Sequence, residues 1–510
     1  MVLATLLLLP FLNTPFTIDD PIYLREAQHA LVDPLHPQAF NMVWSTDLNL
    51  RVSQILPGGV AMPYLLIPTA LADCAEWAGH LTQLLLLLAA LFASALAALR
   101  FGLDAQQARL VAFLTAACPA VLGMAGTVMP DIAAMLFVTL GMERVIAWRD
   151  HRKWHQALLA TCWLTLAVLT RTHTILVLAP AFVLLLDGAS FLPILLTPVA
   201  FLMVSALTAD PEFHGENVLA SMLQLPGGLH LMVQNGFAFL AHWLLVIPLT
   251  IPWLALRFRR LSTTSLVVSL LGASVLSLRL GWVAFAGAAT FVVLVDIAQD
   301  AIERRDRVQL ALWLWLFLAL PVVIYVHLPC KYLLPSVPAA AMLVIREARR
   351  DARWLILSVA TAGVMLGLLI LSGTRDLAQT QRRAVADLID PHVKLGERVW
   401  FAGHWGFQWY AELAGASPVT LQPPFPQPGD IIVVSEIDLP RFPRTWTSRK
   451  VLRRLSYPNG VGRVMDIQAH VGFFSSIFGI LPWIPGSGEA NSFEVWKESG
   501  HAAIAAFYRR

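Results

Sequence analysis

Two adjacent carboxylates, Asp19 and Asp20, follow the first apolar stretch of the chain in the sequence FTIDDPIYLREAQHAL. A third, Asp131, opens a later apolar segment, MPDIAAMLFVTL. Ionised groups at the rim of a membrane bundle are costly to place unless they face water, a partner or a substrate. A carboxylate there can act as a general base toward a hydroxyl or an amine, and several together can hold a divalent metal. Each acid also fits a plain helix cap, so function and capping both remain open.

Two cationic turns could accompany these acids. Lys331 and Tyr332 lie in HLPCKYLLPSVPAAAML, and Arg171 and His173 lie in LTRTHTILVL. A lysine at a buried edge is suited to hold a phosphate as a point charge. The alternative for the lysine is a long side chain that only anchors a helix end, and for the histidine a side chain satisfied within the core.

The elements that must position these side chains are membrane helices. Of the 510 residues, 57% are hydrophobic and 14% are charged, whereas a soluble chain normally has about 25% charged residues. The basic residues form short clusters between apolar runs, which is typical of topology markers, so we expect no nucleic-acid partner. The composition therefore predicts an α-helical polytopic membrane protein.

Apolar runs predict about 13 transmembrane helices. After the first stretch, they lie at roughly 81–99, 110–126, 131–147, 156–170, 174–187, 191–208, 237–256, 262–278, 280–296, 308–328, 332–345 and 354–372. The first stretch has only about 16 apolar residues, or ~24 Å of helix against a ~30 Å hydrocarbon core, so we expect the native chain to start upstream.

Two further regions interrupt or follow this helical part, which we assign to residues 1–373. Residues 17–80, the first outer loop, mix charged residues, prolines and aromatic residues, which favours amphipathic helices at the interface. Residues 374–510 contain short apolar segments such as RVWFAG and GDIIVVSE, separated by turns. This pattern predicts a small extracytoplasmic α/β domain, which His404 and Trp405 are expected to pack.

The loops predict an orientation. Basic clusters such as WRDHRKWH at 148–155 and ERRDR at 303–307 fall in one alternating set of loops, which the positive-inside rule places in the cytoplasm. The three acids, Arg171 and Lys331 fall on the opposite side, and an odd number of spans puts the C-terminus there too. These residues are therefore expected to share one face of a bacterial-type inner membrane.

Common catalytic motifs are missing from the sequence. It contains no P-loop, no GxGxxG after a strand, no Ser/His/Asp elbow and no HExxH. Its four cysteines have no metal-binding or CxxC spacing. We therefore expect no nucleotide site, and any transferred group must arrive on another carrier.

Three stretches resemble the C-type superfamily of membrane glycosyltransferases, which includes the protein O-mannosyltransferases and the bacterial lipid A aminoarabinose transferases. They are DDPIYLREAQHAL, MPDIAAMLFVTL and KYLLPSVPAAAML. The resemblance implies inverting transfer of a hexose or pentose from a polyprenyl-phosphate carrier to a lipid, glycan or protein acceptor on the outer face. One departure is the sequence GGVAMPYLL, where the aminoarabinose transferases have an acid and a lysine before a proline pair and this chain has Ala61 and Met62.

The resemblance also implies roles for the residues singled out above. Asp19 would be the catalytic base, assisted by Asp20 and Asp131. The carrier phosphate would be held by Lys331, with Tyr332, Arg171 and His173 around it. No cofactor is required, although Asp19 and Asp131 could hold a divalent metal.

Two other functions fit the same residues. In a transporter or flippase for a lipid-linked or small solute, the charges would line a pathway and no covalent product would form. In a related enzyme, the site would ligate or polymerise glycans on the outer face. The glycosyltransferase interpretation requires Asp19 and Asp131 in one outer cavity with Lys331 nearby, whereas acids on opposite sides of the bundle would favour transport or capping.

Overall fold

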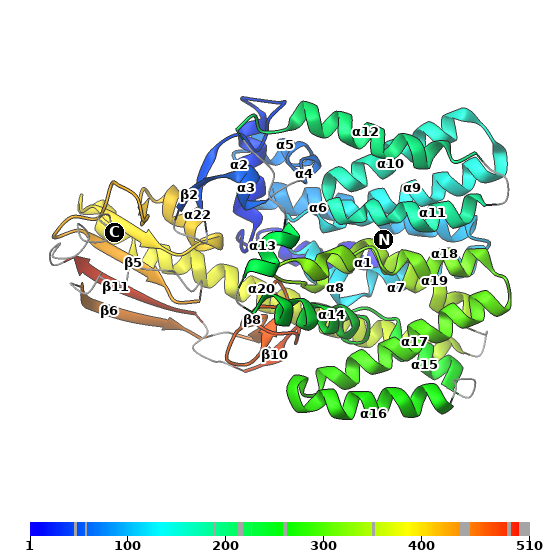
Figure 1. Cartoon of the computed structure of the whole chain (residues 1–510). Helices are drawn as coiled ribbons and strands as arrows, with labels where there is room; N and C mark the ends of the chain where they lie inside the picture. The colour runs from blue at the N-terminus through cyan, green and yellow to red at the C-terminus, as the bar shows by residue number, and fades with distance from the viewer. Residues whose placement is uncertain are drawn as a thin grey trace.

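The computed structural model describes residues 1–498 apart from 45–47, 57–58, 187–189, 213–217, 226, 259–262, 349–351, 438–448, 459 and 487–490. A bundle of long helices forms one end of the molecule, and a β-sheet forms the other (Figure 1). The first outer loop lies between the two parts, beside helix α22 of the sheet end (Figure 1).

Apolar helices make up the bundle. Among the described residues, four helical stretches are long and apolar enough to cross a membrane, and two further pairs can do so if each bent pair counts as one span. The four are α6 (Glu76–Arg100), α17 (Val283–Glu303), the stretch Arg307–Ile324, which contains α18 (Arg307–Trp315) and η4 (Leu320–Ile324), and the stretch Arg353–Lys394. The pairs are α7 (Ala105–Ala116) with α8 (Pro119–Ala125), bent by 60°, and α14 (Gly228–Leu245) with α15 (Thr250–Arg257), bent by 65°.

Shorter or more polar helices complete the bundle. They are α1 (Val2–Leu8), α9 (Asp131–His151), α10 (Trp154–Thr170), η2 (Thr172–Val177), α11 (Leu178–Leu185), α12 (Leu192–Thr208), α13 (Val218–Gln224), α16 (Thr263–Leu280), η5 (Cys330–Ser336) and α19 (Val337–Glu347). The protein is thus a multi-pass membrane protein, as predicted. The count of 13 spans is not confirmed, because several of these helices are shorter than a bilayer core requires.

The first outer loop contains more than the expected amphipathic helices. A two-stranded hairpin pairs β1 (Asn41–Trp44) with β2 (Leu48–Arg51) in antiparallel register. The helices of the loop are α2 (Asp20–Ala30), α3 (Val52–Ile55), α4 (Ala61–Leu65) and α5 (Ile67–Leu71). Helix α2 carries Pro21 in its first turn, where a proline costs no hydrogen bond.

A five-stranded sheet lies near the C-terminus, which fits the α/β expectation. Its order is β4-β3-β5-β11-β6, with β3 parallel to β4 and β5, and β11 antiparallel to β5 and β6. The strands are β3 (Val399–Ala402), β4 (Ser417–Pro418), β5 (Ile431–Ser435), β6 (Arg449–Tyr457) and β11 (Asn491–Glu498). Every residue of β3 and β5 is buried, since apolar clusters cover both faces of these strands.

Helix α20 (Arg353–Leu388) joins the bundle to the sheet without a break. It runs through the predicted boundary between residues 373 and 374 and is followed by α21 (Asp390–Lys394), β3 and α22 (Trp405–Leu413). Two short antiparallel pairs, β7 (Gly462–Arg463) with β10 (Ile484–Pro485) and β8 (Met465–Asp466) with β9 (Val471–Gly472), lie where the sheet end meets the bundle (Figure 1). The buried residues Trp405, Phe473 and Phe474 belong to the same apolar cluster as the bundle, so the two parts share one core.

Candidate active site

An ion pair joins the start of the first outer loop to η5. Lys331 Nζ lies 2.8 Å from Asp19 Oδ2, and the two side chains are 2% and 21% exposed. Burial raises the pKa of the Asp19 carboxyl, but the charge and hydrogen bond of Lys331 outweigh burial and bring the pKa below its usual value. Asp19 is therefore ionised at neutral pH, and the expected proximity of the two residues is confirmed.

Asp20 has a different environment from Asp19, although the two are adjacent. Its carboxylate is fully buried and accepts hydrogen bonds from the backbone N–H groups of Thr17, at 3.0 Å, and Val128, at 2.8 Å. Burial raises its pKa to about 7, against the two backbone hydrogen bonds, which lower it. Asp20 therefore ties the loop to the turn that precedes α9.

A second acid–cation pair lies close to the first. The Arg171 guanidinium donates to both carboxylate oxygens of Asp131, at 3.0 and 2.9 Å. Asp131 is the first residue of α9 and not its N-cap, which is Pro130. The two residues were expected to have separate roles, whereas in the structure they form a planar bidentate pair.

Tyr332 lies between the two pairs. Its ring centroid is 5.0 Å from the Arg171 guanidinium carbon and 5.8 Å from Lys331 Nζ. His173 supports this tyrosine, because its Nε2–H donates to the Tyr332 carbonyl oxygen over 3.2 Å and the two rings meet edge to face. Both cations thus lie within cation–π range of one aromatic ring.

A cavity of about 370 Å³ opens beside Tyr332. It is lined by Tyr23, Leu56, Gly59, Thr170, Arg171, Thr172, His173, Ile175, Pro321, Val322, Ile324, Tyr325 and Tyr332. One cation, one histidine and three tyrosines therefore face a space with otherwise mainly apolar walls, as is common in sites that bind small molecules. Tyr23 and Tyr325 were not singled out from the sequence, although Tyr23 is part of the acidic stretch quoted above.

Two histidines lie near Asp19 that were not expected there from the sequence. His327 lies close enough to Asp19 and Lys331 to interact with their charges, and its Nδ1 is 2.8 Å from Ser475 Oγ. His404 was expected to pack the C-terminal domain, but its ring lies 5.4 Å from that of Trp44 in the first outer loop. Burial lowers the pKa of His404 to about 4, although the charge of Asp19 raises it, so this histidine is neutral.

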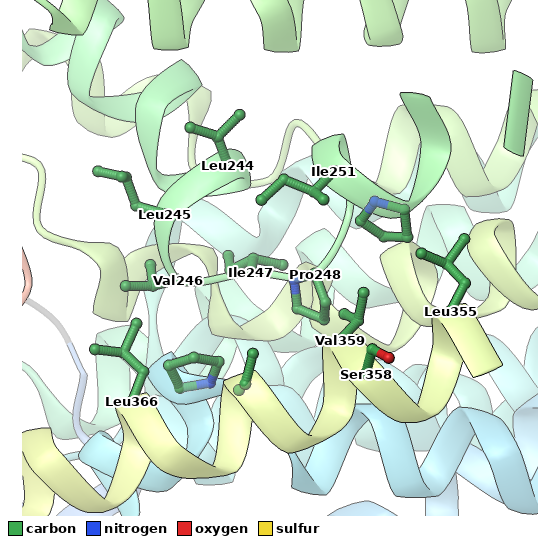
Figure 2. Close-up of a pocket in the computed structure, with 14 residues that line it drawn as sticks. Leu244, Leu245, Val246, Ile247, Pro248, Ile251, Leu355, Ser358, Val359 and Leu366 are labelled. Carbon is green, nitrogen blue, oxygen red and sulfur yellow. The ribbon is translucent and has the colours of Figure 1, made fainter. Parts of the chain in front are cut away.

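A second cavity, of about 350 Å³, lies at the bend between α14 and α15 (Figure 2). Its lining combines α8, the bend and the first half of α20, and the labelled side chains are leucine, isoleucine, valine, proline and Ser358 (Figure 2). No ionisable residue lines it. Its lining therefore offers no charged group that could transfer a proton or hold a phosphate, unlike the cavity beside Tyr332.

The metal alternative does not fit this arrangement. Within the part of the chain that the structure describes, no three His, Cys, Asp or Glu side chains gather as a metal site would require. Asp19 and Asp131 each face a cation of the protein instead. A divalent ion would therefore have to displace Lys331 or Arg171 before either carboxylate could bind it.

No family model and no curated protein sequence matches the chain. The oligosaccharyltransferase of Archaeoglobus fulgidus, solved with Zn and sulfate, is 15% identical with a TM-score of 0.47, over 82% of this chain and 62% of that one. ArnT from Cupriavidus metallidurans bound to undecaprenyl phosphate is 12% identical with a TM-score of 0.44, over 85% and 92%. The mycobacterial arabinofuranosyltransferase AftD is 15% identical with a TM-score of 0.36, over 98% and 41%.

The chain is similar to these three solved structures over 82–98% of its own length. It spans less than two thirds of the length of the Archaeoglobus enzyme. At identities of 12–15% and TM-scores below 0.5, the likeness assigns no role to any residue. Those roles depend on the geometry described above.

Proposed function

We propose that the protein is an integral membrane glycosyltransferase. It moves a hexose or pentose from a polyprenyl-phosphate donor to a lipid, glycan or protein acceptor on the outer face of a bacterial-type inner membrane, where the C-terminal region also lies. The observation that supports the proposal is that the cations of two acid–cation pairs, Asp19–Lys331 and Asp131–Arg171, both lie near the ring of Tyr332. Tyr332 and Arg171 line the cavity, whereas Asp19, Asp131 and Lys331 are not among its lining residues.

In this mechanism Asp19 is the general base. It takes the proton of the acceptor hydroxyl while the acceptor oxygen forms a bond to the anomeric carbon of the donor. The bond between that carbon and the phosphate oxygen breaks, and its electron pair leaves with the polyprenyl phosphate. Attack from the side opposite the phosphate inverts the anomeric centre. Lys331 and Arg171 stabilise the charge that develops on the phosphate, as fixed cations do at such sites.

The ion pair itself would link donor binding to base strength. While Lys331 faces Asp19, it holds the pKa of that carboxyl below its usual value. When a donor phosphate competes for the ammonium group, Asp19 loses that stabilisation and becomes a stronger base. Asp131 keeps Arg171 in place, His173 keeps Tyr332 in place, and Asp20 fixes the backbone of the loop.

The position of the acids favours an enzyme over a transporter or flippase. Asp19 directly precedes α2 of the first outer loop, which lies between the bundle and the sheet (Figure 1). Asp131 and Arg171 lie at helix ends, at the start of α9 and just after α10. A transporter would move its substrate without forming a covalent product. An enzyme that ligates or polymerises glycans would use the same acid and differ in its acceptor.

The test is incubation of the purified protein with labelled polyprenyl-phosphate sugars and a membrane extract, followed by identification of the labelled product. Asp19→Asn is expected to abolish transfer while the protein elutes as a folded species in size-exclusion chromatography. Asp150→Asn, an exposed acid at the far end of α9, is the matched control and is expected to keep full activity. Full transfer by Asp19→Asn would refute the assignment.

A further inference from the structure

The backbone next to Asp19 is held by the C-terminal part of the chain. The N–H of Phe16 donates to the hydroxyl oxygen of Tyr410 on α22 over 2.9 Å, and that hydroxyl donates to Glu76 Oε1 over 2.7 Å. Glu76 in turn accepts from Arg382 of α20. One phenol thus connects the start of the acidic loop, the first turn of α6 and helix α20.

Two further contacts close the loop against the same helices. Thr17 Oγ1 donates to Gln381 Oε1 of α20 over 3.0 Å. Gly406 of α22 approaches so closely that a Cβ at this position would lie 2.1 Å from the Phe16 carbonyl oxygen. Residues 16–17 therefore have little freedom to move away from α20 and α22.

The residue before Asp19 has a strained backbone. Ile18 adopts a φ of +50°, in the left-handed region that a β-branched side chain rarely enters. Such a conformation persists only where its surroundings impose it. The fixed positions of Phe16 and Thr17 on one side and of Asp20 on the other supply that constraint, and they aim Asp19 at Lys331.

Lys331 is also held by the C-terminal part, through a different segment. Residues 473–476 enter the bundle, where Phe473 and Phe474 are buried in its core. The N–H of Leu328 donates to Ser476 Oγ over 2.9 Å, and Cys330 Sγ lies 3.6 Å from the Phe473 carbonyl oxygen. The turn that carries Lys331 thus rests on this segment.

We propose that the C-terminal region, residues 374–498, positions both members of the Asp19–Lys331 pair. Tyr410 is the positioning residue for the acid, and Ser476 is the positioning residue for the lysine. Neither is a catalytic residue, since each acts through the backbone beside the pair. The effect on turnover rests on the proposed function, whereas the effect on the geometry of the pair does not.

Two variants test the proposal, with one matched control. Tyr410→Phe removes the hydroxyl but keeps the ring, and Ser476→Ala removes the acceptor for the Leu328 N–H. Tyr457→Phe is the control, because Tyr457 also donates its hydroxyl to a carboxylate of α20, Asp387, over 2.8 Å but lies in the sheet. If one test variant fails to fold, the labelling result of the other variant tests the proposal.

The first measurement does not depend on activity. Lys331 is treated with a small amine-acylating reagent in the intact protein, and its modification is quantified by mass spectrometry. In the parent protein the side chain is buried and paired, so labelling is slow. Tyr410→Phe and Ser476→Ala are each expected to raise its labelling several-fold, and Tyr457→Phe is expected to leave it unchanged. Equal labelling in all four proteins would overturn the proposal.

The second measurement is steady-state transfer. Both test variants are expected to lower kcat about tenfold to a hundredfold, the loss typical of a misplaced reacting group, with KM for the donor within about twofold of the parent value. The acid limb of the kcat–pH profile is expected to move to higher pH, because a loosened Lys331 no longer lowers the pKa of Asp19. A fall in kcat without increased labelling would overturn the positioning role. Increased labelling in the two variants, with no sugar transfer even by the parent protein, would uphold the positioning role and refute the proposed function.

Discussion

Loss of the charge at Asp19 is expected to destabilise the protein more than loss of the charge at Lys331. The reason is the unequal exposure of the two side chains, which is 2% for the lysine and 21% for the acid. Removing one partner of a buried ion pair costs about 3–5 kcal/mol. Asn at position 19 can still accept a hydrogen bond from the ammonium group, so we expect Asp19→Asn to cost ~3 kcal/mol, the lower end of that range.

Removal of the lysine charge instead leaves the Asp19 carboxylate, which water can reach. Lys331→Met is therefore expected to cost about 1 kcal/mol, close to the value of a solvent-accessible pair. The double variant buries neither an unpaired ammonium nor a charged pair, so it is expected to be about as stable as Lys331→Met alone. The coupling free energy between the two sites would then be ~3 kcal/mol, within the range measured for residues in contact.

The assay is reversible unfolding in mixed micelles, with all four proteins measured at one pH and one detergent composition. Transfer activity is measured in parallel and is expected to be lost in all three variants. The two single variants could instead lose equal amounts of unfolding free energy, and the double variant could lose their sum. Such additivity would show that the two charges do not interact. That result would refute the assignment of a buried ion pair to these residues.

Three further predictions concern the surroundings of this pair. Arg171→Lys is expected to lower transfer about tenfold, because an ammonium group cannot make the two parallel hydrogen bonds to Asp131, and steady-state kinetics would measure it. Burial raises the pKa of Glu26 from 4.5 to about 8, although Gln38 donates to it. The stability that neutral Glu26 contributes is therefore complete below pH 4.5 and is lost as pH rises through 8. The thermal unfolding temperature should consequently fall less from pH 5 to 8 in Glu26→Gln than in the parent protein. Gly406→Ala is expected to abolish transfer by pushing α22 from the acidic loop, whereas Gly236→Ala, with open space around it, should keep activity.

Composition and topology predicted part of this site. Apolar runs indicated a bundle of membrane helices, and the positive-inside rule put Asp19 and Lys331 at one end of it although they are 312 positions apart in the sequence. Residue types then sufficed to suggest an acid and a cation that could meet. Their roles remain predictions, since the geometry shows the contact and not the reaction.

Pairing within the site was harder to predict. Nothing in the sequence joins Asp131 to Arg171, because both residue types are common at helix ends and their pairing depends on how α9 and α10 pack. His327 lies four residues before Lys331 in the quoted stretch, but only the folded turn brings it near Asp19. Such side-chain contacts depend on how each helix is rotated about its axis and on the angle at which helices cross. The apolar pattern of a single sequence does not specify either.

The contribution of the C-terminal region could not be predicted from local patterns. Strands β3 and β5 were recognised from their apolar runs, and the sheet near the C-terminus fits the α/β domain expected there. Tyr410, however, contacts a residue 394 positions earlier. His404 was assigned to the interior of a separate domain because nothing in FAGHWGFQWY indicates that it contacts the first outer loop.

The two adjacent aspartates at the start of α2 have different partners, since Asp19 pairs with Lys331 and Asp20 accepts from backbone N–H groups. Ile18, directly before them, has a left-handed backbone conformation, and in this arrangement Asp19 reaches the lysine while Asp20 accepts from the main chain. A homologue can therefore keep the acidic doublet letter for letter and still be inactive, if a one-residue deletion ahead of it rotates the second carboxylate into the place of the first. Function in distant homologues is better judged by the spacing between the end of the first helix and the doublet than by the doublet alone.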